Sequence, residues 1–176
     1  TVCWVPIDHD PCPPPIAQFL AASDAVPIAM SKFGQSKLQD AGLDALYVPH
    51  AVDTEVYRPI PKDEARAITK LPEDAFIVGM IAANKGNPSR KSFDKVMQAF
   101  KELRAQRSDA ILYLHTELTG RMDGVDLPEL ASVLGIPAES IMYPNQYRTV
   151  HFPYDDEHMA NVYSSLDVLA MPSEGE

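Results

Sequence analysis

Hydrophobic and polar positions alternate in blocks along this chain, and the clearest blocks lie between residues 76 and 103. The apolar run Phe76–Ile81 predicts a buried strand, because a strand that is covered on both faces is apolar throughout. A polar loop follows this run. Beyond the loop, large apolar side chains recur at helical spacing, at Phe93, Val96, Met97, Phe100 and Leu103. We therefore expect a strand, a loop and a helix with one face on a sheet.

The same alternation continues to the end of the chain. It predicts strands at Ala110–His115, at residues 141–143 and at residues 167–171. It predicts helices over residues 63–69, over Leu127–Leu134 and over residues 155–164. Strands that alternate with helices in this way indicate a parallel sheet between helical layers.

The first sixty residues show a shorter version of the pattern. Apolar stretches predict strands at residues 1–6, 26–30 and 45–48, and Ser31 is placed to cap a helix that ends before Gly42. The prolines at 13–15 predict irregular structure, since proline fixes φ and removes a donor. Residues 50–62 are polar, contain prolines and have no period, so we interpret them as a crossing between two domains.

In a parallel α/β sheet, ligands sit beyond the carboxyl ends of the strands. The loops that should form a site are residues 82–90, 116–126, 144–154 and 172–176. Lys85, Arg90 and Lys91 precede the helix that begins near Phe93, and side-chain cations beside a helix N-terminus suit a diphosphate. On the residues alone, solvated loop charges are an equally good interpretation.

The last predicted loop carries two acidic residues beside Gly175. Glu174 and Glu176 are candidates to accept hydrogen bonds from sugar hydroxyls. As a bare pattern, two solvated carboxylates are the simpler interpretation.

Composition and motifs exclude several classes of protein. The formal net charge of −10 argues against nucleic-acid binding, which needs an excess of cations. The segment GNPSRKS at 86–92 lacks the second glycine of a P-loop, and no GxGxxG follows a predicted strand. Neither GxSxG nor HExxH occurs, and the five histidines have no ligand spacing. We therefore expect no metal and no cofactor.

The compartment is inferred from what the chain contains. Its two cysteines, Cys3 and Cys12, suit a reducing environment, and no apolar run is long enough to span a bilayer. The first residues lack the basic start and apolar middle of a signal peptide. We expect a cytoplasmic protein. The chain starts without methionine and stops directly after an apolar run, so we also expect a fragment of a longer protein.

Two stretches of the chain resemble a known family. AMSKFGQSKLQDAGLDALYVPHAVDTEVYRP and NVYSSLDVLAMPSEGE are similar to segments of glycosyltransferase family 4, whose members are retaining nucleotide-sugar enzymes of GT-B fold. Pro49, Val52, Asp53, Tyr57 and Pro59 match the family segment P-N-G-V-D-x-x-x-F-x-P at the right spacing. Residues 162–176 match the family stretch L-Y-x-x-x-D-x-x-x-x-P-S-x-x-E.

The resemblance implies a fold and a set of site residues. It implies two Rossmann-like domains, with residues 1–57 ending the acceptor domain and residues 58–176 forming much of the donor domain. Glu176 corresponds to the first glutamate of the family's E-x7-E motif, which contacts the donor sugar. Lys91 corresponds to the lysine of K-G-x-x, which binds donor phosphates. Tyr154, in the long base-binding loop, is a candidate to stack on the base, and a packed loop tyrosine is the alternative.

The sequence also departs from the family. His50 and Ala51 replace the usual Asn-Gly, and Met80 stands where an arginine normally follows the strand glycine, so Lys85 or Arg90 would take that role. Thr116 and Glu117 occupy the position of a G-x-G turn.

The function that the resemblance implies is transfer of a sugar from a nucleoside diphosphate sugar to an acceptor hydroxyl, with retention of configuration and without a metal. The fragment alone should bind donor and not turn over. The acceptor class stays open between glycan, lipid, protein and small molecule, and so does peripheral membrane association. Two alternatives also stay open: a non-catalytic nucleotide or sugar-phosphate binding module of the same fold, and a structural α/β domain that binds a protein partner.

Overall fold

The computed structural model describes residues 1–86 and 88–173 and divides into two compact units, Thr1–Asp53 and Thr54–Glu176. Both units contain a parallel sheet with helices, so the chain has the predicted α/β fold with Rossmann-like topology. Tyr57, at the end of the first expected domain, donates a hydrogen bond to Asp156 at 2.9 Å. It is therefore held by the second unit.

The first unit is a three-stranded parallel sheet in the order β1-β2-β3. Its elements are β1 (Val2–Val5), α1 (Pro14–Ala22), β2 (Val26–Ala29), α2 (Lys32–Asp40) and β3 (Leu46–Tyr47). The core contains Leu20 of α1, Ala29 of β2 and Leu38 of α2. The predicted cap is confirmed, because Ser31 Oγ accepts a hydrogen bond from the Gly34 amide at 2.9 Å.

The prediction of irregular structure over residues 13–15 is wrong for most of that run, since α1 begins at Pro14. The first helical positions have amides with no partner inside the helix, so a proline there loses no hydrogen bond. Its fixed φ also suits the helix. The three prolines therefore start a helix where we expected a loop.

The second unit contains a four-stranded parallel sheet in the order β6-β5-β4-β7. Its strands are β4 (Phe76–Ile81), β5 (Ala110–His115), β6 (Ile141–Met142) and β7 (Val168–Leu169). The bounds of β4 and β5 are those predicted, and the two pair in register along their whole length, from Phe76 opposite Ala110 to Ile81 opposite His115. The edge strands β6 and β7 are shorter than predicted.

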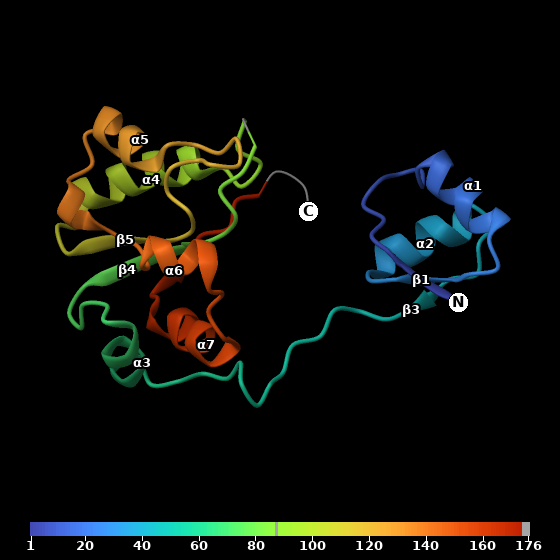
Figure 1. Cartoon of the computed structure of the whole chain (residues 1–176), viewed down its shortest axis with the longest axis horizontal. Coiled ribbons are helices and arrows are strands. Elements are labelled where there is room, and N and C mark those ends of the chain that lie inside the picture. The colour runs from blue at the N-terminus through green and yellow to red at the C-terminus, as the bar shows by residue number, and fades with distance from the viewer. Residues whose placement is uncertain (87, 174–176) are drawn as a thin grey trace. The chain divides into compact units, whose positions relative to one another are not determined.

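Helices cover both faces of this sheet (Figure 1). They are α3 (Lys62–Thr69), α4 (Phe93–Gln106), α5 (Leu127–Leu134) and α7 (Asp156–Ser165). The stripe of α4 predicted from the sequence is buried against Val78, Met80 and Leu112, together with α5. The opposite face packs on α7 through Val162 and Leu166.

The strand order reverses at β4. The chain runs from β4 through β5 to β6 on one side and then returns to β7 on the other side of β4. In open α/β sheets this reversal leaves a crevice at the carboxyl ends of the strands. The loops that follow β4 and β7 therefore meet the same edge as the loop that follows β5.

Gly79 in the middle of β4 allows α7 to end close to the sheet. A Cβ at this position would lie 2.2 Å from a Leu166 methyl carbon. A larger residue at this position would force the Leu166 side chain to move, so the glycine allows the present packing of Leu166 on the strand.

A second helix, besides α1, was not predicted. The segment 144–154 was expected to be a loop, but it contains α6 (Gln146–His151), and Asn145 Oδ1 accepts a hydrogen bond from the Arg148 amide at 3.0 Å as its cap. None of the α6 residues is buried. A helix without an apolar stripe gives no periodic signal in the sequence, which is why the pattern did not reveal it.

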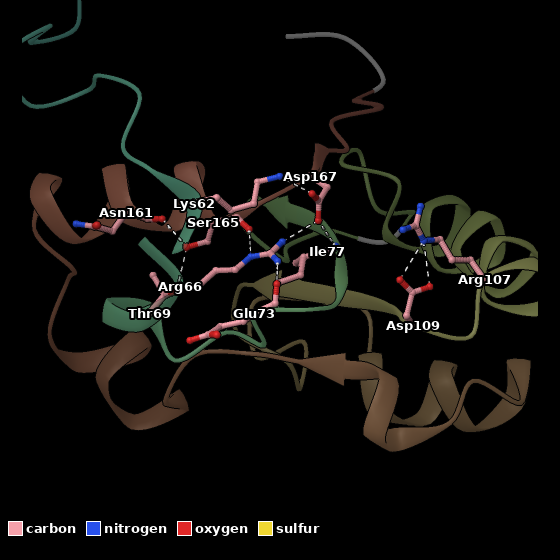
Figure 2. A network of polar contacts seen from close by, with 10 residues as sticks. All are labelled: Lys62, Arg66, Thr69, Glu73, Ile77, Arg107, Asp109, Asn161, Ser165 and Asp167. Carbon is pink, nitrogen blue, oxygen red and sulfur yellow. Dashed lines mark hydrogen bonds and ion pairs between the residues drawn. The ribbon is translucent and has the colours of Figure 1, made fainter. Parts of the chain in front are cut away.

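A buried ion pair closes the amino-terminal end of the sheet (Figure 2). The Arg66 guanidinium donates to Asp167 Oδ2 at 2.8 Å, to the Ser165 carbonyl at 3.0 Å and to the Glu73 carbonyl at 2.5 Å. Asp167 also accepts from the Ile77 amide at 2.7 Å. Arg66 is 4% exposed, so α3, β4 and the start of β7 are joined inside the unit.

Candidate functional site

A pocket of about 500 Å³ lies at the carboxyl edge of the second unit's sheet. It is formed by the segments that follow β4 and β5 and by the connection from α6 to α7. Its lining includes Ala82, Ala83, Asn84, His115, Thr116, Glu117, Met122, Thr149, Pro153 and Tyr154. Three of the four loops predicted to form a site are thus brought together here, and the fourth, residues 172–176, is described only to residue 173.

Asn84 fixes the rim of this pocket. Its side-chain amide donates to the Glu117 carbonyl at 3.0 Å and to the Val125 carbonyl at 2.7 Å, and its Oδ1 accepts from the Val125 amide at 2.9 Å. Its own backbone amide donates to Thr116 Oγ1 at 3.1 Å. The side chain is almost fully buried, so the loop after β4 is rigidly tied to the loop after β5.

The same two loops approach too closely for a side chain at Gly124. A Cβ there would lie 2.5 Å from the Asn84 carbonyl oxygen. The contact continues one residue further along, where Lys85 forms a bridge with Met122 and the Gly86 amide donates to the Met122 carbonyl at 3.2 Å. Lys85 is therefore held at the rim by its backbone, with its side chain exposed.

Gln146, the first residue of α6, attaches that helix to the pocket. Its Oε1 accepts from the Leu118 amide at 3.0 Å, and its Nε2 donates to the Thr116 and Pro144 carbonyls, each at 3.1 Å. One side chain thus pairs backbone groups after β5 and after β6. α6 is a fixed wall of the pocket in spite of its exposure.

Glu117 adds a negative charge to the rim. Its carboxylate accepts from the Thr119 amide at 2.8 Å, from the Thr119 hydroxyl at 2.5 Å and from the Arg121 amide at 3.1 Å. Partial burial alone would raise the pKa of this carboxyl, but these hydrogen bonds and the Arg121 charge hold it below its ordinary value. Glu117 is consequently ionised at neutral pH.

An aromatic cluster closes the bottom of the pocket. Tyr113 Oη lies 3.0 Å from His115 Nδ1, and the His115 ring contacts Tyr154 with centroids 5.1 Å apart. Burial lowers the pKa of His115 to about 4, and the neighbouring His158 adds to this effect. Burial likewise raises the pKa of Tyr113, with Tyr154 contributing. The imidazole is uncharged at neutral pH.

Tyr154 lines the pocket, as expected of a base-binding residue, and it is also packed. Its ring stacks on His158 with centroids 4.6 Å apart, and the Arg148 guanidinium carbon lies 4.3 Å from its centre. The two interpretations of this side chain are therefore compatible: it is held in place and it presents a surface to the pocket. Stacking on a base stays a prediction.

The N-terminus of α4 has unusual backbone and polar groups. Ser92, the cap residue, has φ 57° in the left-handed region and is 1% exposed, yet its side chain makes no capping hydrogen bond. Among the described residues, the buried hydroxyls of Ser89 and Ser92 are without a hydrogen-bond partner. A positive φ is a conformation that favours glycine, so a serine is strained at this position.

The predicted cations lie in the turn directly before this helix. Arg90 is exposed and Lys91 is half-buried, both within a few residues of the unpaired hydroxyls. The turn begins only a few residues after the pocket rim at Asn84. Glu174 and Glu176, the predicted sugar-binding residues, lie outside the described residues.

Asn84, Gln146 and His115 were missed as site residues. A polar side chain directly after an apolar strand was the signal for Asn84. Gln146 offered no signal, because its partners are as far as 30 residues away in sequence.

Over residues 1–86 and 88–173, no group of three or more His, Cys, Asp or Glu side chains could hold a metal ion. No helix within these ranges is both long and apolar enough to cross a membrane.

Comparisons with known proteins were informative only at the level of structure. No protein-family model matches the chain, and no curated protein matches its sequence. Solved structures of glycosyltransferases do match it, and they share the GT-B fold.

Three of these structures span most of the chain. Sucrose-phosphate synthase from Thermosynechococcus elongatus matches 90% of it with a TM-score of 0.68 and 20% identity, over 37% of its own length. A glycosyltransferase from Rickettsia africae matches 97% with a TM-score of 0.66 and 14% identity, over 45% of its length. HepE of Anabaena, solved with UDP and glucose, matches 84% with a TM-score of 0.58 and 18% identity, over 38% of its length. The chain thus spans less than half of each of these proteins.

Proposed function

We propose that this chain is the donor-binding part of a retaining glycosyltransferase of family 4, which moves a sugar from a nucleoside diphosphate sugar to an acceptor hydroxyl. The observation that carries the proposal is the position of the pocket, at the carboxyl ends of β4 and β5 and close in sequence to the N-terminus of α4. The likeness to glycosyltransferase structures supports sugar transfer, and the UDP and glucose held by HepE support a nucleotide-sugar donor.

We assign the nucleoside to the pocket and the diphosphate to the helix. Ala83 at the rim, whose position Asn84 and Thr116 fix, would offer its backbone groups to a base or ribose, and Tyr154 would offer an aromatic surface. Amides at the start of α4 and the positive end of its dipole favour the diphosphate.

Side chains before α4 would strengthen that phosphate site. Arg90 and Lys91 add positive charge, with Lys85 at the rim. The buried hydroxyls of Ser89 and Ser92, which have no partner among the described residues, would donate to a phosphate only after a local rearrangement exposes them. A buried hydroxyl without a partner costs stability unless something pairs with it, and a phosphate oxygen would do so.

The chemistry follows from the leaving group. When the sugar departs, negative charge develops on the diphosphate, and preorganised positive groups lower the barrier most where that charge appears. The N-terminus of α4 with Lys91 and Arg90 would supply such charge without a metal ion. Glu176, with Glu174, would orient the sugar, as the family resemblance implies.

Calorimetric titration of the chain with UDP, GDP and ADP tests the proposal. We expect one of the three to bind saturably and to bind about tenfold or more weakly to Lys91→Ala, because a charge-assisted contact to phosphate is lost. Lys101→Ala is the matched control, since it also removes a lysine charge, but from an exposed position within α4 and away from its N-terminus. Absence of binding by all three nucleotides, or equal weakening in both variants, would contradict the assignment.

A turnover assay tests whether this chain binds donor without completing the transfer reaction. We assign the acceptor side of the reaction to residues outside this chain, so the 176-residue chain should bind donor without releasing nucleotide in the presence of acceptors. Nucleotide release above background by this chain alone would show that the division is wrong, even if the binding results stand.

A further inference from the structure

A second and larger pocket lies on the other side of the aromatic cluster. Its volume is about 810 Å³, and it opens on the sheet face that packs against α3 and α7. It is bounded by the end of α3, by Tyr113 of β5, by the end of β6 and by the start of α7. Among the described residues, Tyr154 is the one that lines both this pocket and the candidate donor pocket.

The charged side chains that line this second pocket are both cations. They are Lys70, directly after α3, and Arg148, in α6, and the lining contains no aspartate or glutamate. Within the part of the chain that the structure describes, neither cation pairs with a carboxylate, although the whole chain has a net charge of −10. A local excess of positive charge in an acidic protein favours an anion.

A third group in the lining, His158, carries no charge at neutral pH. Burial lowers its pKa, and the nearby Arg148 lowers it further, while Asp155 at the start of α7 acts in the opposite direction. Asp155 caps the helix by accepting from the His158 amide at 2.8 Å and is absent from the lining. The two cations therefore set the charge of the pocket.

Much of the lining between these cations is apolar or aromatic. Leu71, Met142, Phe152 and Tyr154 line the pocket together with Tyr113, which is 6% exposed and keeps its hydroxyl on His115. Arg148 lies over the Tyr154 ring, so one cation is already at the edge of an aromatic surface. A pocket with apolar walls and a few convergent polar groups is the usual form of a small-molecule site.

We propose that this pocket binds a small anionic ligand with a flat apolar body, such as an aryl phosphate, with Arg148 and Lys70 on the anion and the Met142 and Phe152 walls on the ring. The site is separate from the donor site and does not depend on the function proposed above. Because Tyr154 forms a wall of both pockets, a ligand here would touch a side chain that also faces the donor pocket.

Amide and methyl chemical-shift mapping with 1-naphthyl phosphate tests the proposal on the intact chain. We expect saturable shifts at Tyr113, Met142 and His158, with a dissociation constant of about a millimolar or lower for a ligand of this size. Inorganic phosphate has the anion without the ring, and 1-naphthol has the ring without the anion. Each should bind about tenfold or more weakly than 1-naphthyl phosphate. Absence of shifts at these residues in the wild-type chain would overturn the proposal.

Variants then identify the groups responsible. Arg148→Gln and Lys70→Asn should each weaken 1-naphthyl phosphate about tenfold, because each removes a charge-assisted contact. Asparagine is chosen at residue 70 because it tolerates the positive φ of 63° found there. Lys101→Gln, on a helix of the opposite sheet face, should bind as the wild type does. Equal weakening in Lys101→Gln would overturn the proposal, and so would complete displacement by the nucleotide that fills the donor pocket.

Discussion

The two ends of the second unit's sheet differ in whether their buried polar groups have hydrogen-bond partners. At the amino-terminal end, the Arg66 guanidinium and the Asp167 carboxylate satisfy each other and several backbone groups (Figure 2). At the carboxyl end, the cap residue of α4 has a left-handed backbone and, with Ser89, a buried hydroxyl that lacks a partner among the described residues. The first end stabilises the fold, whereas the second leaves buried polar groups unpaired among the described residues, as we expect of an end that binds a ligand.

The largest effect on stability is expected from breaking the Arg66–Asp167 pair at the amino-terminal end. Asp167→Ala leaves the Arg66 charge buried without its carboxylate and leaves the Ile77 amide unpaired, so it should lower the free energy of unfolding by about 3–5 kcal/mol in urea titration. Asp109→Ala is the control, because it breaks the exposed pair with Arg107 drawn in the same figure. A loss in Asp167→Ala no larger than in the control would contradict a structural role for this end.

The same variant should change the pH dependence of stability. Partial burial would raise the pKa of Asp167, but hydrogen bonds from Lys62, the Ile77 amide and Arg66 outweigh it and hold the pKa below its ordinary value. A lowered folded-state pKa contributes stability that is complete above about pH 4 and is lost as the pH falls further. Asp167→Ala should therefore lose less stability than the wild type between pH 4 and pH 2. Identical acid slopes would argue against this ion pair.

A smaller effect, of opposite sign, is expected at the other end. Ser92→Gly removes a side chain from a left-handed backbone and also removes a buried unpaired hydroxyl, so it should raise the free energy of unfolding by about 1 kcal/mol. Ser92→Ala removes only the hydroxyl and should remain less stable than the glycine variant. If Ser92→Gly is less stable than the wild type, the hydroxyl has a partner in the folded chain and the comparison of the two ends fails.

The smallest effect at neutral pH is expected from the aromatic cluster at the bottom of the candidate pocket, because His115 is uncharged there in both the folded and the unfolded chain. Burial lowers the pKa of His115 to about 4, so its NMR titration should have a midpoint there instead of near 6.5. The neutral ring contributes stability that is complete above about pH 6.5 and is lost as the pH falls through about 4. His115→Gln should flatten the stability curve in that window. A midpoint near 6.5 would show that the ring is solvated.

Most helices and strands of this fold could be predicted because the pattern that indicates each of them lies within a short stretch of sequence. The apolar run of β4 and the helical spacing from Phe93 to Leu103 each follow from a few neighbouring residues, and both were found with nearly correct bounds. α6 was missed because it has no apolar stripe, and α1 was missed because the prolines at its start predicted irregular structure at positions where a helix tolerates proline.

The candidate site could be predicted only in part, because many of its contacts join residues that are far apart in the sequence. Its cations could be selected because they precede a predicted helix, but the groups that shape the pocket join distant segments. Asn84 bonds to Val125, 41 residues away, and Gln146 bonds to Thr116, 30 residues away. Such pairs are set by the strand order, which the periodicity of a single sequence does not give. The positive φ of Ser92 could not be predicted from the sequence either, because serine rarely adopts a left-handed backbone.

The most direct test of the account is amide chemical-shift mapping of the nucleotide that binds in the calorimetric titration. If the carboxyl end of the sheet is the functional end, the largest shifts should fall on the amides of Ser92, Phe93 and Asp94 at the start of α4, and on Ala83 and Thr116 at the pocket rim. The Arg66 and Ile77 signals at the amino-terminal end should stay in place. Saturable binding that shifts the Arg66 end, or that leaves the start of α4 unchanged, would contradict the central claim.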